Sequence, residues 1–176
     1  VNVTAPDGRK IAAEYGVLTS FGEKTAGAAA VIEMAKASGL ALMDENALDP
    51  LSATSRGTGE LIASALNEGI RNILIGIGGS ATNDGGMGAA AALGVKFLDA
   101  EGNELSGCGR ELALVRKIDL SGLRRDVFEA KITVMCDVDN PLTGKNGATY
   151  TYGPQKGADA EALNTLEDGM KNIAAL

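Results

Sequence analysis

Residues 72–94, NILIGIGGSATNDGGMGAAAALG, constrain the fold more than any other part of the sequence. The first six residues form a short apolar run with β-branched side chains, which is typical of a buried strand. A glycine-rich loop follows at 78–86. An alanine-rich stretch at 87–93 then predicts a helix that Gly94 ends. A strand, a loop and a helix in this order are the building unit of an α/β fold.

The sequence before this unit predicts a hairpin, a strand and a helix. Asp7-Gly8 between alternating segments indicates the hairpin. Residues 28–35 favour a strand followed by a short turn, although their alanine content equally fits a helix ending at Gly39. A helix is expected at 58–68, because its apolar residues fall on one face and Gly69 follows as a stop.

The sequence after this unit adds a second hairpin, a second buried strand and a final helix. We expect the hairpin at 95–105, a connection at 118–123, the strand at 132–136, loops at 137–147 and 150–157, and the helix from 159 to the end. No linker, repeat or low-complexity stretch divides the chain. We therefore expect an α/β fold with a mixed β-sheet and flanking helices, in one domain over residues 1–176.

The absence of histidine narrows the chemistry that the chain can perform. It excludes Ser-His-Asp and Cys-His nucleophile systems within the chain. It also excludes imidazole-ligated zinc, and two cysteines cannot build a four-thiolate zinc site. Acid–base work must fall to carboxylates, Lys, Tyr or Cys, and a bound metal would be a hard cation such as magnesium. Cys108 and Cys136 are expected to be free thiols in a reducing cytosol, with Cys136 in the core.

The charge balance excludes several classes of partner. Sixteen Lys and Arg against 23 Asp and Glu give a net charge of −7, which argues against a nucleic-acid or acidic-membrane surface. No apolar run approaches the length of a membrane span, and the first residues lack the pattern of a signal peptide. A cytoplasmic location is therefore expected.

The glycine-rich loop is the first candidate site. Backbone N–H groups at Gly78 and Gly79 can approach a ligand closely, and the following helix N-terminus adds partial positive charge, so the loop suits a phosphate or another anion. Ser80, Thr82 and Asn83 add polar side chains. The alternative, at about even odds on pattern alone, is that the glycines serve a tight turn and that Asp84 caps the helix.

A second candidate site follows the strand at 132–136. Ligands of open α/β sheets bind beyond the carboxyl ends of strands. Asp137, Asp139 and Asn140 supply two carboxylates and an amide there, which can hold magnesium or orient a hydroxyl. Ordinary turn chemistry at residues 139–141 explains the same residues, and on pattern alone it is favoured.

Two cations complete the set of candidates. Lys156 lies between two glycines in YGPQKG and can meet a phosphate or carboxylate, although a lone lysine is more often solvated. Arg56 comes just before the helix at 58–68 and can bind an oxyanion at the helix N-terminus. Capping of that helix by Ser55 or Thr58 is at least as good an explanation of the segment.

Taken together, these segments resemble one known family. The blocks DPLSATSRGTGELI, IGIGGSATNDGGMG, CDVDNPLTGKNGAT and YGPQKGA, in this order and spacing, are similar to those of the bacterial glycerate kinases of type I, the glycerate 2-kinases. The segments VTAPDGRKIAAEYG and AAVIEMAKASGLALM also resemble that family, so the likeness covers essentially the whole chain.

The resemblance implies ATP-dependent phosphorylation of D-glycerate to 2-phosphoglycerate. It also implies that the chain is incomplete, because the family's APDSxK-type, DGGEGT-like, PGAGAAGG-like and GEGxxD-like motifs are absent. The chain looks like the domain that is inserted in a two-domain kinase, with the active site in the cleft between the domains. The missing initial Met and a final helix without a cap agree with this expectation.

The resemblance assigns roles to the candidate residues. Asp84 and Asp137 are the candidate catalytic carboxylates and magnesium ligands. Contacts to glycerate or phosphate are expected from the other candidates, which are Gly78, Gly79, Ser80, Thr82, Asn83, Arg56, Asn140 and Lys156.

For the whole enzyme the resemblance implies ATP and Mg²⁺ as cofactors and glycerate as the small-molecule substrate. The isolated chain is expected to be inactive and to pack on the missing domain, with a homo-oligomer as a further possibility. The alternative is a non-catalytic phosphate-binding module, or one that serves domain docking or oligomerisation.

Overall fold

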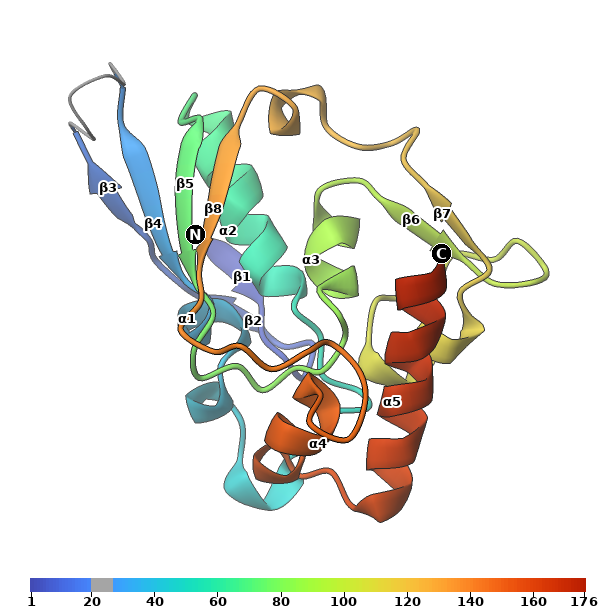
Figure 1. Cartoon of the computed structure of the whole chain (residues 1–176). Coiled ribbons are helices and arrows are strands. Elements are labelled where there is room, and N and C mark those ends of the chain that lie inside the picture. Colours follow the sequence, from blue (N-terminus) through green and yellow to red (C-terminus); the bar gives the residue numbers. More distant parts are fainter. Residues whose placement is uncertain (20–26) are drawn as a thin grey trace.

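A mixed four-stranded sheet organises the protein. The computed structural model describes residues 1–19 and 27–176. The strands lie in the order β3-β4-β5-β8 (Figure 1), and they comprise Gly16–Leu18, Ala29–Glu33, Asn72–Gly76 and Lys131–Met135. β4, β5 and β8 are parallel, and β3 pairs antiparallel with β4. The α/β fold with a mixed sheet and flanking helices, which the sequence predicts, is confirmed.

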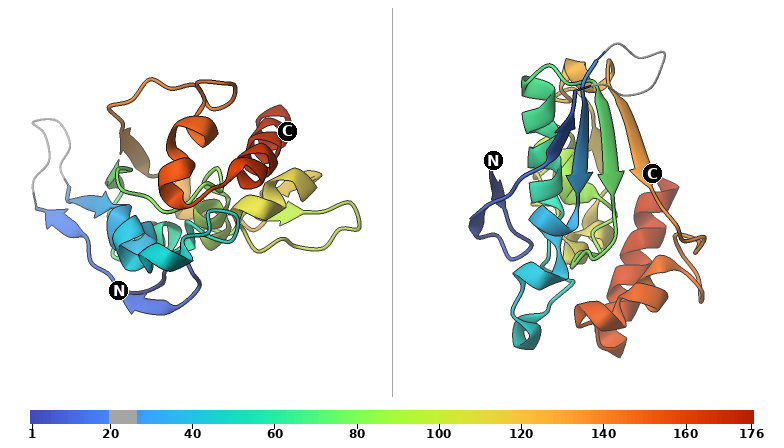
Figure 2. Two further views of the ribbon diagram at one scale, coloured as in Figure 1. Left: turned by 90° about the horizontal axis from the view of Figure 1, so that it is seen from below. Right: turned by 90° about the vertical axis from the view of Figure 1, so that its left-hand side faces the viewer.

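Helix α2 (Arg56–Asn67) covers one face of this sheet (Figure 2). Its apolar stripe includes Leu61 and Leu66, which join Ile32, Ile73 and Ile75 in a cluster whose buried members are at most 8% exposed. Each such side chain contributes about 1.5–3 kcal/mol through its removal from water. The helix that the sequence predicts at 58–68 is therefore present, and it begins two residues earlier.

A second core lies on the other side of α2. Helix α3 (Met87–Ala92), the 3₁₀ helix η3 (Gly109–Leu114) and the long helix α5 (Ala160–Ala175) enclose Met87, Leu112 and Met170. The antiparallel pair β6 (Lys96–Leu98) and β7 (Lys117–Asp119) adds Phe97 to this cluster. The two parts meet at the contact of α2 with α3, where Gly59 allows close approach. A Cβ at Gly59 would lie 2.2 Å from the Ala89 carbonyl oxygen.

The predicted N-terminal hairpin is confirmed as β1 (Asn2–Thr4) paired with β2 (Lys10–Ala12). It is attached to α2 through Glu60, whose carboxylate accepts hydrogen bonds from the Thr4 backbone N–H and the Thr4 hydroxyl. Among the helices of residues 1–19 and 27–176, none combines the length and the apolarity that a bilayer-spanning segment needs.

The strand predicted at 132–136 forms, but the prediction that it is buried is wrong. Every residue of β8 is exposed. Ile132 and Val134 pair in register with the buried Ile73 and Ile75, yet they are 37% and 51% exposed. The reason is position, because β8 is the edge strand of the sheet (Figure 1). Cys136, predicted to be a core thiol, is also exposed.

The hairpin predicted at 95–105 is confirmed: Leu98 bridges Glu104, and the Leu105 N–H donates to the Phe97 carbonyl at 2.8 Å. Further expectations need correction. The connection predicted at 118–123 begins as strand β7, which also pairs with β6. The loop predicted at 150–157 is helical, as α4 (Ala148–Tyr152) and η5 (Pro154–Lys156).

Helical turns also replace the short turn expected after β4. These turns are α1 (Ala35–Ser38), η1 (Leu40–Leu42) and η2 (Glu45–Ala47); a further one, η4 (Arg125–Val127), precedes β8. Turns of three or four residues are too short to show a helical period in the sequence. They are stabilised mainly by tertiary contacts.

Candidate functional site

A cavity of about 440 Å³ lies beyond the carboxyl ends of β5 and β8. Three segments line it: residues 77–80 after β5, residues 136–142 after β8, and residues of α4 and η5 between 148 and 156. Ligands of α/β sheets occupy this edge because the loops that follow neighbouring parallel strands converge there. Three of the segments that the sequence singles out therefore meet at one place.

The turn after β5 presents backbone donors to this cavity. Gly79 adopts a φ of +71°, which only glycine reaches without strain. The turn is held from behind, because the Gly79 carbonyl accepts from the Leu40 N–H at 2.9 Å and the Ala81 N–H donates to the Ser38 carbonyl at 2.9 Å. In the part of the chain that the structure describes, the N–H groups of Gly78, Gly79 and Ser80 donate to no protein acceptor. Successive free N–H groups of this kind suit an anion.

Lys156 extends from η5 toward this turn instead of into solvent. The residue is only 9% exposed, and its Nζ donates to the Ser80 hydroxyl at 3.0 Å and to the Thr82 carbonyl at 2.5 Å. Burial lowers the pKa of Lys156 to about 8, and the nearby charge of Asp84 only partly offsets this effect. The solvated-lysine alternative is therefore excluded, and a buried cation lines the cavity.

Asp84 lies away from the cavity and is buried. Its Oδ2 accepts hydrogen bonds from the Ser55 N–H and the Ser55 hydroxyl, both at 2.7 Å, and from the Gly88 N–H at 3.3 Å. Its Oδ1 accepts from the Gly86 N–H at 3.1 Å. Burial raises the pKa of this carboxyl, while these hydrogen bonds act in the opposite direction. Gly86, and not Asp84, is the N-cap residue of α3, but the Asp84 carboxylate accepts from N–H groups at the start of α3 and ties this helix to the start of α2. The N-terminus of α3 therefore faces a protein carboxylate.

The two residues before Asp84 are also turned inward. Thr82 is 5% exposed, and its carbonyl accepts from Lys156. Asn83 is 7% exposed, and its amide donates to the Thr149 hydroxyl at 3.3 Å. Neither residue lines the cavity, whereas Gly78, Gly79 and Ser80 do. The glycine-rich loop is therefore divided into a cavity-facing half and a half that connects α3 to the rest of the protein.

Asp137 and Asn140 both line the cavity, but in different ways. Asp137 is exposed. The side chain of Asn140 is occupied: its Oδ1 accepts from the Tyr152 hydroxyl at 2.6 Å, and its amide donates to the Asn146 carbonyl at 3.0 Å. Asn140 therefore joins the loop after β8 to α4.

Arg56 is the one predicted cation that lies elsewhere. It is the first residue of α2 and forms an ion pair with Glu60 at 3.6 Å, with 43% of its side chain exposed. It does not line the cavity. Ser55, the proposed cap of this helix, makes no side-chain capping bond to α2; its hydroxyl instead accepts from the Ala89 N–H of α3 at 3.0 Å.

Two residues of this region have no counterpart in the sequence predictions. Tyr152 lines the cavity and holds Asn140. Glu167 of α5 is 1% exposed and accepts a hydrogen bond from the Gly144 N–H at 2.7 Å, which attaches the loop after β8 to α5. The position of Tyr152 beside GPQKG was a usable signal. Glu167 offered none, because a glutamate within a helix is most often solvated.

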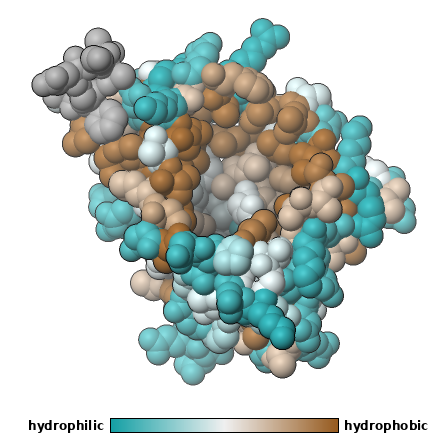
Figure 3. Space-filling view, viewed as in Figure 1, coloured by the Kyte–Doolittle hydropathy of each residue, from teal (hydrophilic) through white to brown (hydrophobic). Residues whose placement is uncertain are grey.

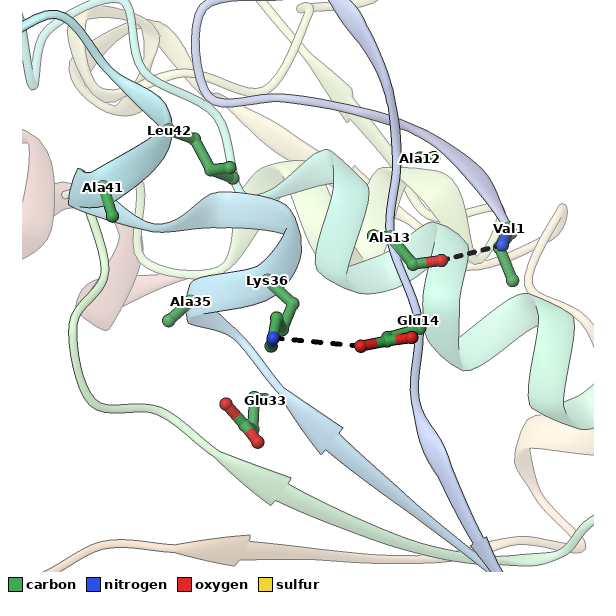
Figure 4. A pocket seen from close by; sticks show the side chains of 9 residues that line it. All are labelled: Val1, Ala12, Ala13, Glu14, Glu33, Ala35, Lys36, Ala41 and Leu42. Carbon is green, nitrogen blue, oxygen red and sulfur yellow. Dashed lines mark hydrogen bonds and ion pairs between the residues drawn. The ribbon is translucent and has the colours of Figure 1, made fainter.

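A larger cavity, of about 670 Å³, lies on another part of the surface (Figure 4). Small alanines and a weak ion pair between Lys36 and Glu14, with 3.9 Å between the charged atoms, make up much of its lining. None of the predicted site residues lines it. We place the candidate site in the smaller cavity because convergent polar groups, and not volume, distinguish a binding site.

Comparisons with known proteins agree on one family. A model of the "Glycerate kinase family" matches residues 1–176. A glycerate kinase of Bacillus subtilis (strain 168) is 48% identical over 172 residues, which cover 98% of this chain and 44% of that protein. A glycerate 2-kinase of Escherichia coli (strain K12) is 49% identical with the same coverage of both chains.

A solved structure agrees in fold. A crystal structure from Salmonella typhimurium LT2, described as a glycerate kinase 2, superposes with a TM-score of 0.92 at 46% identity, over 100% of this chain and 46% of that one. The chain thus spans less than half the length of these relatives. Because the family model covers every residue, the chain belongs to the glycerate kinase family.

Proposed function

We propose that this chain is part of an ATP-dependent kinase that phosphorylates the 2-hydroxyl of D-glycerate to give 2-phosphoglycerate, and that it forms one wall of the active-site cleft. The observation that carries the proposal is the meeting of Lys156, Ser80 and Asp137 at one cavity, from three segments far apart in the sequence. Phosphoryl transfer depends on positioning and charge neutralisation more than on covalent chemistry, and these groups supply both without a histidine.

Each group at the cavity has a distinct task in this proposal. The free N–H groups of Gly78 and Gly79, together with the Lys156 ammonium, hold anionic oxygens of glycerate or of the transferred phosphoryl group. Asp137 lies within reach of the same space and orients the glycerate hydroxyl or accepts its proton.

Magnesium and ATP fit this donor set. No group of three or more His, Cys, Asp or Glu side chains that could hold a metal exists among the described residues. Magnesium commonly needs only one or two carboxylates beside substrate phosphates, and Asp137 is the carboxylate that lines this cavity. When bound, the metal would neutralise charge on the nucleotide phosphates.

The remaining predicted residues have supporting tasks in this proposal. Asp84, Thr82 and Asn83 hold the turn and α3 in place from behind the cavity. Asn140 fixes the loop that carries Asp137. Arg56 lies outside the cavity. In this proposal it contacts the substrate only if the rest of the protein extends the cleft to it.

Exposed apolar side chains support docking onto the rest of the protein. Figure 3 shows apolar residues around a hollow beside β8. Ile132 and Val134 of β8, and Val138 and Leu142 after it, are each at least 37% exposed. Contiguous apolar surface of this kind marks an interface. The relatives carry more than half their length outside the matched region, so we propose that the remainder of the protein covers this surface. A second copy of the chain is the alternative occupant of this surface.

We also propose that the protein is cytoplasmic.

The test is an assay of the complete protein with D-glycerate and Mg-ATP, with the product identified by ³¹P NMR. We expect 2-phosphoglycerate. Formation of 3-phosphoglycerate would contradict the assigned hydroxyl, and no turnover would contradict the function. Asp137→Asn should lower kcat at least about a hundredfold if the carboxylate acts on the hydroxyl. Asp139→Asn is the matched control, because Asp139 is exposed and does not line the cavity.

The 176-residue chain alone should show no turnover in the same assay. Clear activity of that chain would contradict the proposal that part of the cleft comes from elsewhere. A chain that binds neither glycerate nor Mg-ATP but pairs through β8 would favour the non-catalytic docking module instead.

A further inference from the structure

The hydrogen bond between Lys156 and Ser80 fixes more than the position of the two side chains. An ammonium group has only donors, so in the 3.0 Å contact the Ser80 Oγ must be the acceptor. The hydroxyl keeps its own proton, and its O–H bond must point away from Lys156. In the described part of the chain, this hydroxyl donates to no protein acceptor. Ser80 lines the cavity, so its O–H is available there.

Lys156 itself is held in a defined position. Two of its three N–H groups donate to the Ser80 hydroxyl and the Thr82 carbonyl, which brackets the turn at 80–82. Lys156 is 9% exposed and lines the same cavity, and among the described residues its third N–H donates to no protein acceptor. A positive charge that donates to a hydroxyl also polarises it and makes it a better donor.

We propose that Lys156 is a positioning residue that fixes the Ser80 hydroxyl as a donor to a carboxylate or phosphate oxygen in the cavity. The free N–H groups of Gly78 and Gly79 on the same turn have the same preference for an anion. The pair therefore acts as one unit, because without the ammonium the Ser80 proton has no preferred direction. This inference rests on the proposed function only for the identity of the anion.

The prediction is a non-additive pattern of variants. In the complete protein, Ser80→Ala should weaken binding of the anion about tenfold, the cost of one hydrogen bond to a charged group. In a Lys156→Met background the same Ser80→Ala change should cost less than about threefold, because the donor is no longer oriented. Ser80→Thr, which keeps the hydroxyl, should restore most of the affinity. Lys117→Met, on an exposed lysine of β7, is the matched control and should change nothing.

Three titrations distinguish the source of the anion. Calorimetry is done with D-glycerate, with Mg-ATP, and with inorganic phosphate as a probe that needs no turnover. A loss confined to D-glycerate assigns Ser80 to the carboxylate, and a loss confined to Mg-ATP assigns it to a phosphate. If the wild-type protein fails to phosphorylate glycerate but binds phosphate with the same non-additive pattern, the proposed function fails and this inference stands.

Two outcomes overturn the inference. One is equal cost of Ser80→Ala with and without Lys156, which would mean that the two side chains act independently. The other is unchanged affinity in Ser80→Ala for all three probes. Loss of Lys156 can disturb the turn. Binding by Ser80→Ala and Ser80→Thr is therefore measured first with Lys156 unaltered, and folding is checked by circular dichroism.

Discussion

Lys156 is a lysine whose ammonium group lies inside the protein. Burial of this charge makes the free energy of unfolding depend on pH, in a direction that can be measured. The pKa of Lys156 is lowered from 10.5 to about 8, so between these values the unfolded chain binds more protons than the folded one. Stability therefore rises with pH through this window. Below about pH 8 the charged group is present in both states, and the free-energy cost of burying it is fully expressed.

We accordingly expect the free energy of unfolding, relative to that of Lys156→Met, to increase by a few kcal/mol between about pH 8 and 10.5. The measurement is urea unfolding of both proteins at several pH values. The comparison cancels the titration of groups common to both. A difference that stays constant across the window would show that the ammonium is not destabilised in the fold.

Asp84 is a buried carboxyl whose hydrogen bonds oppose the effect of burial on its pKa. All four of its hydrogen bonds come from donors in Ser55, Gly86 and Gly88, so it must offer acceptors on both oxygens. Asp84→Asn keeps the shape but replaces one acceptor by a donor that faces other donors. We expect the free energy of unfolding to fall by about 2–4 kcal/mol, because a buried polar group is left unpaired.

This effect is measured by denaturant unfolding. Asp139→Asn, at an exposed carboxylate, should change stability by less than about 0.5 kcal/mol. If Asp84→Asn leaves stability intact but abolishes turnover, the residue acts in the chemistry, and our assignment of a supporting task is incorrect.

At the scale of elements, the loop after β8 is held by contacts to helices that follow it in the chain. The Tyr152 hydroxyl of α4 donates to Asn140 at 2.6 Å, and Glu167 of α5 accepts from the Gly144 N–H at 2.7 Å. These contacts fix a segment that has no regular structure of its own. The geometry of Asp137 therefore depends on α4 and α5 as well as on β8.

Tyr152→Phe removes the donor to Asn140 and leaves the ring in place. We expect kcat/KM for glycerate to fall about two- to tenfold, the cost of one hydrogen bond, because the loop that carries Asp137 loosens. Tyr150→Phe is the matched control on the same helix, since the Tyr150 hydroxyl meets only the exposed Asn164. Equal effects of the two changes, measured by steady-state kinetics, would show that the Asn140 contact has no special role.

At the scale of the whole molecule, the unusual feature is a strand of an α/β sheet with exposed apolar side chains. Strands of parallel sheets are ordinarily covered on both faces. β8 is instead open, and the apolar hollow beside it is visible in Figure 3. The matched region accounts for only 44% of the Bacillus and Escherichia relatives, so most of such a protein lies outside the part described.

We expect Val134→Asp to lower the stability of the complete protein by about 2–4 kcal/mol, because it would bury an unpaired charge beneath the rest of the chain. Thermal unfolding measures the effect. Ala100→Asp, at the exposed turn after β6, should leave the melting temperature within about 2 °C of the wild type. A Val134→Asp protein as stable as the wild type would mean that this surface stays open to solvent.

The sequence by itself determined the elements whose signal is local. The unit at 72–94, the helix of residues 56–67, the N-terminal hairpin and the last helix follow from periodicity, turn residues and β-branched runs. The same patterns identified the three segments that line the cavity, because glycines and polar residues at strand ends are themselves local features. Family membership also follows from motifs, which are short and contiguous.

Only the tertiary structure decided where each of these side chains lies. Ser55 and Asp84 are 29 residues apart, and Ser80 and Lys156 are 76 apart, yet each pair is within hydrogen-bond distance. A side chain's burial and its protonation depend on such distant neighbours, which no local pattern contains. For this reason Asp84 turned inward, Lys156 became a buried cation and β8 remained an exposed edge, although the sequence around each is compatible with the opposite arrangement.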